Sequence, residues 1–105
     1  MARVVFSGLA DLDINGILVD LAAKAGRFVA VKYDGLFEQL YDRLAGHPNS
    51  GAPRPALGEH IRIGIVAPFI VIYQYAEDID TVTVLRVVDG RRRISGRMLP
   101  LGEDN

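Results

Sequence analysis

The chain has 105 residues, with 12 basic and 13 acidic side chains, a net charge of −1 and no cysteine. Half of the residues are hydrophobic and 24% are charged, which excludes a disordered chain and predicts a single globular domain over residues 1–105. The lack of cysteine excludes disulfides and thiolate metal sites, and we expect no cofactor. The longest apolar run, residues 63–73, is too short to cross a bilayer, so we expect a cytoplasmic protein.

The first half of the chain predicts a strand followed by two helices. Arg3–Phe6 is short, β-branched and aromatic, as in a strand. Ser7 then suits the start of a helix that Gly26 ends. A second helix is predicted over 27–45, antiparallel to the first, because the link between them is short. Gly35 lies inside this helix, where we expect it to permit close packing against the first helix.

The second half predicts a loop and three strands. Residues 49–59 contain two glycines and two prolines and predict an ordered surface loop without regular structure. Three strands are expected after it, over 61–66, 69–75 and 82–88, with an acidic turn before the last one. The order β-α-α-β-β-β indicates an α+β fold, in which the helical hairpin packs on one face of a mostly antiparallel sheet.

Positive charge gathers near the C-terminus. Residues 86–97 hold five of the chain's 12 basic side chains and a single acid, Asp89. Arg91, Arg92 and Arg93 follow the last strand, where such residues form either a solvated rim or a site for carboxylates or phosphates. The net charge of the whole chain gives no general attraction to nucleic acid, and we expect no sequence-specific DNA binding.

Other polar residues lie within the predicted strands. By period-two counting, Arg86 shares a face with Val82, Val84 and Val88, so it needs either an acid of this chain or a partner's groove. Arg62 alternates with isoleucines and is expected to point to solvent. Tyr73 is expected to pack in the core or at its rim, on the same face as Tyr75.

Several segments, in order along the chain, carry a resemblance to a known family. They are LADLDINGI (9–17), FEQLYDRLAGHPNSG (37–51), RPALG (54–58), HIRIGIVAPFIVIYQY (60–75) and VLRVVDGRRRI (84–94). Together they resemble the RelE/ParE toxins of type II toxin–antitoxin pairs and are most similar to the ParE branch. The chain departs from the family pattern at Asp89, where histidine is frequent, and at Ala52, where arginine is frequent; both changes remove positive potential.

The resemblance implies a toxin that poisons DNA gyrase by binding and is neutralised by a ParD-like, ribbon-helix-helix antitoxin. It implies contacts with the partner or target rather than catalytic residues, and the candidates are Arg86, Arg91, Arg92, Arg93, Arg62 and Tyr73. Two alternatives remain: a RelE-like endonuclease that cuts mRNA in the ribosome, and a degenerate, non-toxic member that acts as an interaction module.

The distribution of side chains favours binding over catalysis. A metal-free ribonuclease needs a general base, a general acid and cations around the phosphate. The only lysines, Lys24 and Lys32, lie in the predicted hairpin, and the last tyrosine is Tyr75. Arginine stays protonated and is a poor general base. The arginine tract therefore lacks proton-transfer groups beside it.

Overall fold

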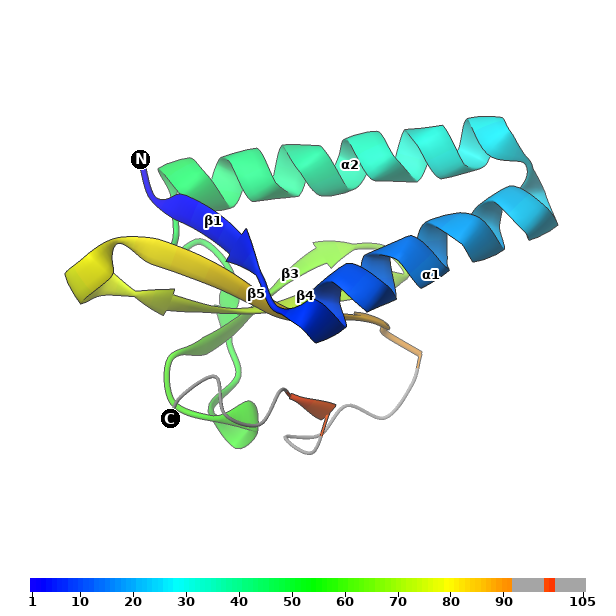
Figure 1. Cartoon of the computed structure of the whole chain (residues 1–105). Helices are drawn as coiled ribbons and strands as arrows, with labels where there is room; N and C mark the ends of the chain where they lie inside the picture. The colour runs from blue at the N-terminus through cyan, green and yellow to red at the C-terminus, as the bar shows by residue number, and fades with distance from the viewer. Residues whose placement is uncertain (92–97, 100–105) are drawn as a thin grey trace.

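The computed structural model describes residues 1–91, 98 and 99 of the chain. Two helices form a hairpin that lies over one face of a five-stranded sheet and extends past its edge (Figure 1). The elements are β1 (Arg3–Phe6), α1 (Gly8–Ala25), α2 (Arg27–Gly46), β2 (Ala52–Pro53), η1 (Pro55–Leu57), β3 (Ile61–Val66), β4 (Phe69–Ala76), η2 (Glu77–Ile79) and β5 (Thr81–Asp89). The α+β fold is confirmed.

The ends of α1 follow the capping signals of the sequence. The Ser7 hydroxyl accepts a hydrogen bond from the amide of Ala10, which satisfies one of the free N–H groups of the first turn. Gly26 has φ +96°, a value that side chains rarely allow, and its amide donates to the carbonyl of Ala22. This single residue ends α1 and begins the turn into α2.

The sheet has the strand order β1-β5-β4-β3-β2. β1 runs parallel to β5, with Arg3 opposite Thr81, and the other three pairs are antiparallel. The predicted loop over 49–59 is corrected in part, because Ala52 and Pro53 pair with β3 and η1 follows them. Two residues with weak strand preference give no sequence signal for such a pairing.

A β-bulge changes which side chains of β5 share a face. Ile72 of β4 lies opposite Arg86, but Tyr73 lies opposite Val84, so Leu85 is an extra residue on β5. The prediction that Arg86 shares a face with Val82 and Val84 is therefore wrong. The bulge shifts the period-two count by one residue from Leu85 onward.

The sheet carries one apolar cluster on each face. The larger cluster lies under the hairpin and includes Phe37, Leu40 and Leu44 of α2 together with Tyr73 of β4. The second cluster consists of Ile61, Ile63, Ile72, Leu85 and Val88, each at most 6% exposed. None of the described residues of α1 or α2 belongs to it. The second cluster therefore lies on the face away from the hairpin.

The start of α1 covers the part of β5 that extends beyond β1. The amide of Ser7 donates to the carbonyl of Val84 (2.9 Å), and its hydroxyl donates to the carbonyl of Leu85 (2.7 Å). The amide of Val87 donates to the carboxylate of Asp13 at 3.0 Å. These contacts supply partners for a strand edge that would otherwise be open to pairing with other chains.

Much of the apolar surface of the hairpin remains in solvent. Ala10 is the one buried residue of α1 in the described chain, whereas Leu12 and Val19 are each 70% exposed. Near the start of α2, Phe28 is 88% and Val31 is 63% exposed. No described helix has the length and apolar character needed to span a membrane.

The expectation for Gly35 is wrong. A Cβ atom built on Gly35 would have no neighbour within 4 Å among the described atoms. The two helices therefore do not approach each other closely at this position.

Candidate partner-binding site

Arg86 is held by an acid of its own chain. Its Nε and Nη2 donate to the two carboxylate oxygens of Asp13 at 2.7 and 2.9 Å, and its Nη1 donates to the carbonyl of Met98 at 2.6 Å. The two side chains are 17% and 16% exposed. The hydrogen bond to Asp13 raises the pKa of Arg86. Of the two alternatives from the sequence, pairing within the chain is confirmed.

The arginine tract begins with a local ion pair. The exposed guanidinium of Arg91 donates to both carboxylate oxygens of Asp89, and the amide of Arg91 donates to Oδ1 at 2.9 Å. This pair raises the pKa of Arg91. Asp89, which stands where the family frequently has histidine, therefore offsets part of the positive charge. Arg92 and Arg93 lie outside the described residues, and their place in the site stays a prediction.

Arg62 and Tyr73 fasten the loop that follows α2. Nη1 of Arg62 donates to the carbonyls of Asn49 (3.0 Å) and Gly51 (2.8 Å). The Tyr73 hydroxyl donates to the carbonyl of Pro48 (2.8 Å) and accepts from the amide of Gly51 (2.9 Å). The predicted core position of Tyr73 is confirmed, because its side chain is fully buried, and burial raises its pKa.

The prediction that Arg62 points to solvent is confirmed only in part, because the side chain borders an open pocket but is half-buried. Its guanidinium donates hydrogen bonds to two backbone carbonyls of the loop. Alternation with isoleucines identifies the face of the strand but not the loop that returns over it. Arg62 and Tyr73 therefore serve any site on this loop by holding the backbone in place.

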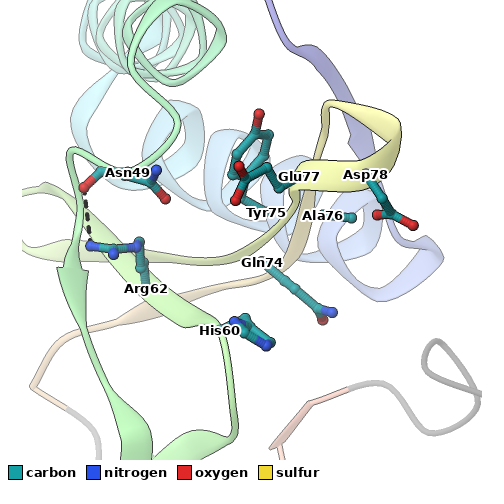
Figure 2. Close-up of a pocket in the computed structure, with 8 residues that line it drawn as sticks. All are labelled: Asn49, His60, Arg62, Gln74, Tyr75, Ala76, Glu77 and Asp78. Carbon is teal, nitrogen blue, oxygen red and sulfur yellow. Dashed lines mark hydrogen bonds between the residues drawn. The ribbon is translucent and has the colours of Figure 1, made fainter.

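An open pocket of about 390 Å³ lies beside this loop. Figure 2 shows Arg62 and His60 on the β3 side of the pocket and the acidic residues Glu77 and Asp78 on the η2 side. His60 has φ +63°, an uncommon value for a residue with a side chain. The pocket has mixed charge, so its electrostatics do not select a phosphate.

A groove runs between α2 and the outer edge of β3. Two adjoining hollows of about 400 and 420 Å³ share Leu40, Arg43 and Ile65 as lining residues. β2 pairs only with residues 62 and 63 of β3, which leaves Gly64–Val66 without a strand neighbour on that side in the described chain. Ile65 is 56% exposed. The groove thus combines apolar side chains, two arginines (Arg43 and Arg54) and an open strand edge.

The described residues provide no metal-ligand group, and the candidate arginines among them are bonded within the chain. They contain no group of three or more histidine and acidic side chains that could hold a metal ion. The described arginines of the candidate set, Arg62, Arg86 and Arg91, bind acceptors of their own chain.

The candidate residues predicted from the sequence did not include those of two exposed surfaces, although we expected an antitoxin segment to lie along the hairpin and at the sheet edge. The hairpin stripe of Leu12 and Val19 and the groove at Ile65 were not among the candidates. The signal for the stripe is present in the sequence, since α1 is apolar on more sides than one core contact can bury. The groove had no such signal, because it depends on how few residues of β2 pair with β3.

Comparison with known proteins places the chain in a family. Residues 4–94 match the model of the ParE toxin of the type II toxin–antitoxin system parDE. A comparison with curated protein sequences gave no significant match.

Two solved structures share the fold. A chain of the chromosomal ParDE system from P. aeruginosa superposes with a TM-score of 0.70 at 20% identity, covering 85% of this chain and 96% of that one. A chain of the RelBE2 complex from Mycobacterium tuberculosis gives 0.60 at 20% identity, covering 84% and 96%. Identities this low show the fold alone. With the family match over residues 4–94, the chain belongs to the ParE toxins of type II toxin–antitoxin systems.

Proposed function

We propose that this protein inhibits growth by binding to and poisoning DNA gyrase, and that a ParD-like antitoxin neutralises it by covering the hairpin and the groove beside β3. The exposed apolar surface of the hairpin is the observation that supports an antitoxin partner. Leu12, Val19, Phe28 and Val31 are each at least 63% exposed, and apolar surface of this kind marks binding sites on soluble proteins.

The antitoxin segment fits the hairpin as a helix. Leu12 and Val19 are seven residues apart on α1, so they lie on one face of the helix, two turns from each other. An amphipathic helix recognises such a surface through apolar side chains at matching intervals. The antitoxin is therefore expected to bury its own apolar stripe against these two residues.

The groove beside β3 suits the continuation of the same segment. Gly64–Val66 can pair with an added strand, and Arg43 lines both hollows of the groove. An acidic side chain of the antitoxin would pair with Arg43, and others with the tract over 91–93. Charge complementarity of this kind sets register and association rate more than affinity.

Antitoxin binding is tested by co-purification and titration with the product of the adjacent small gene. Val19→Lys places a charge on the hairpin stripe and should weaken the complex by about 2 kcal/mol or more, as for a central interface residue. Ile79→Lys is the matched control, because Ile79 is 67% exposed but lies in η2. An equal loss of antitoxin affinity in both variants would show no specific role for the hairpin stripe and would reject it as the binding site.

The match to the ParE toxin family supports gyrase as the target, in keeping with the resemblance to the ParE branch. Expression of the chain should produce double-strand DNA breaks, as gyrase poisons do, while mRNA stays intact. Breaks that disappear in cells with a poison-resistant gyrase would support the proposal. Growth arrest without DNA breaks would reject gyrase as the target.

The pocket in Figure 2 favours one second candidate, a ribosome-dependent mRNA endonuclease. His60 and Glu77 are proton-transfer groups that line the same pocket as Arg62. Primer extension on translated mRNA after induction separates the two candidates, since site-specific cuts lost in His60→Ala would replace the gyrase proposal. The paired acids of the pocket oppose this candidate, because they repel a phosphate.

A further inference from the structure

The hairpin stripe of Leu12 and Val19 continues along α1 through two small residues. Its members follow one another at helical spacing and so lie on one line of the helix surface: Leu12, Gly16, Val19 and Ala23. All four are exposed. A Cβ atom built on Gly16 would have no neighbour within 4 Å among the described atoms. The core contacts of α1 come from other residues, which include Ile14, Ile17 and Leu21, so the stripe is open to a partner.

Large and small side chains alternate along the hairpin stripe, and this order is self-complementary. A copy of α1 that lies antiparallel, with a two-fold axis between residues 17 and 18, places each large residue opposite a small one. Leu12 faces Ala23 of the second copy, and Val19 faces Gly16 of the second copy. The symmetry repeats each contact, and the alternation lets the two helices pack closely without voids.

The charges of the hairpin follow the same symmetry. Residues 8–20 contain three acids and no basic residue, whereas residues 21–33 contain three basic residues and no acid. The antiparallel copy therefore places an acidic half against a basic half, with Asp11 opposite Lys24 of the second copy. The contact of Lys24 with Asp20 is an exposed pair of little stability, so Lys24 can exchange it. A parallel copy would place like charges opposite each other, which disfavours that orientation.

The fold leaves room for a second copy beside the stripe. Figure 1 shows the hairpin extending past the edge of the sheet, which leaves its tip accessible. An open hollow of about 480 Å³ lies between the first half of α1 and the sheet, and Leu12 and Gly16 form one of its walls. Asp20 and Asp89 also line this hollow. The basic tip of a second copy would therefore meet a hollow with acidic residues in its walls.

We propose that a second copy of this chain binds along the hairpin stripe, antiparallel and two-fold symmetric, so that the free protein forms a homodimer. A single pair of 18-residue helices makes an interface at the small end of the range for protein complexes, so the dimer dissociates readily. Leu12 and Val19 are also the residues that the antitoxin is proposed to cover. Self-association and antitoxin binding therefore exclude each other, and this consequence alone rests on the proposed function.

Sedimentation equilibrium of the full-length chain without antitoxin tests the dimer. The wild type should change from monomer to dimer as its concentration rises through the micromolar range. Gly16→Gln fills the space that Val19 of the second copy would use and should weaken dimerisation by roughly tenfold or more. The same substitution should raise the thermal midpoint of the monomer, because glutamine is favoured over glycine inside a helix. Ile79→Gln changes an exposed residue of η2 and should dimerise as the wild type does.

Crosslinking tests the orientation of the two helices. The chain has no cysteine, so Leu12→Cys and Ala23→Cys each introduce a single thiol. Under oxidising conditions, a mixture of these two variants should form the mixed disulfide faster than either variant forms its own. A mixture of Ala23→Cys and Ile79→Cys is the control and should crosslink slowly.

Three results would overturn the proposal. They are a monomer at every concentration, an unchanged dimer in Gly16→Gln, and self-crosslinking of Leu12→Cys that exceeds the mixed reaction. The dimer is measured without antitoxin, so its absence would leave the proposed antitoxin surface standing. A dimer that persists with the antitoxin bound would support self-association and reject the stripe as the antitoxin surface.

Discussion

The guanidinium of Arg86 and the carboxylate of Asp13 are joined by two hydrogen bonds of 2.7 and 2.9 Å across 73 residues of sequence. One residue lies at the bulge of β5 and the other in the first turns of α1. The same carboxylate accepts from the amide of Val87. A single acid therefore fixes the start of the hairpin against the edge of the sheet.

Breaking the Arg86–Asp13 pair should lower the free energy of unfolding more than breaking an exposed ion pair does. In Arg86→Met, Asp13 keeps the Val87 amide but loses its charged partner at 16% exposure. We expect a loss of about 2 kcal/mol in the free energy of unfolding, measured by urea denaturation. A double-mutant cycle with Asp13→Asn should give a coupling of about 1–3 kcal/mol.

The matched control is the ion pair of Lys24 and Asp20, whose side chains are 76% and 58% exposed. Lys24→Met should change the free energy of unfolding by less than about 0.5 kcal/mol. A result for Arg86→Met as small as that of Lys24→Met would contradict the fastening role of Asp13.

Tyr73 and Gly51 should prove critical for the loop. Tyr73→Phe removes the hydroxyl that bonds Pro48 and Gly51 and should destabilise the protein by about 1–3 kcal/mol. In Gly51→Ala, the new Cβ would lie 2.5 Å from the Ile63 carbonyl and from the Tyr73 hydroxyl, so a comparable or larger loss is expected. Gly46→Ala meets no atom within 4 Å and should leave the urea midpoint nearly unchanged.

Gly35→Ala should stabilise the protein. Gly35 lies inside α2, and an alanine methyl group there meets no atom within 4 Å. Alanine is favoured over glycine in a helix interior by about 1 kcal/mol, so the thermal midpoint should rise. Gly26→Ala is the opposite case, because φ is +96° there, and it should lower the midpoint. Loss of stability in Gly35→Ala would mean that the helices pack more closely at this position than described.

Tyr75 gives a prediction for alkaline pH. The hydrogen bond that its hydroxyl donates to Asp80 (2.6 Å) raises the pKa of Tyr75 to about 12. A tyrosine in the unfolded chain ionises near pH 10. The stability from this contact is therefore fully present below about pH 10 and is lost as the pH rises toward about 12. The advantage of wild type over Tyr75→Phe in urea midpoint should shrink across that window, and tyrosinate absorbance should lose its latest component in the variant.

Local signals predicted the elements of the fold well. Ser7 and Gly26 mark the ends of α1 because capping and positive φ each demand particular residues. Ala52 and Pro53 have no comparable local requirement, so the sequence did not predict their pairing with β3. Their position follows from Arg62 and Tyr73, which bind the preceding loop from strands far along the chain.

The candidate site was predicted less well, because it depends on tertiary contacts. One extra residue at Leu85 changes the face of every later side chain in β5, and a bulge leaves no periodic signal of its own. The need of Arg86 for a partner could be predicted from its apolar surroundings. The identity of that partner, Asp13, could not, since the pairing arises only when α1 packs against β5.

Growth of cells that express this chain tests the central claim most directly. The chain alone should arrest growth, and co-expression of the adjacent small gene should restore it. Val19→Lys should still arrest growth but resist the rescue, because it changes the hairpin surface and not the fold, whereas Ile79→Lys should be rescued normally. Normal growth with the soluble, folded chain present at the level that the antitoxin otherwise neutralises would contradict the account.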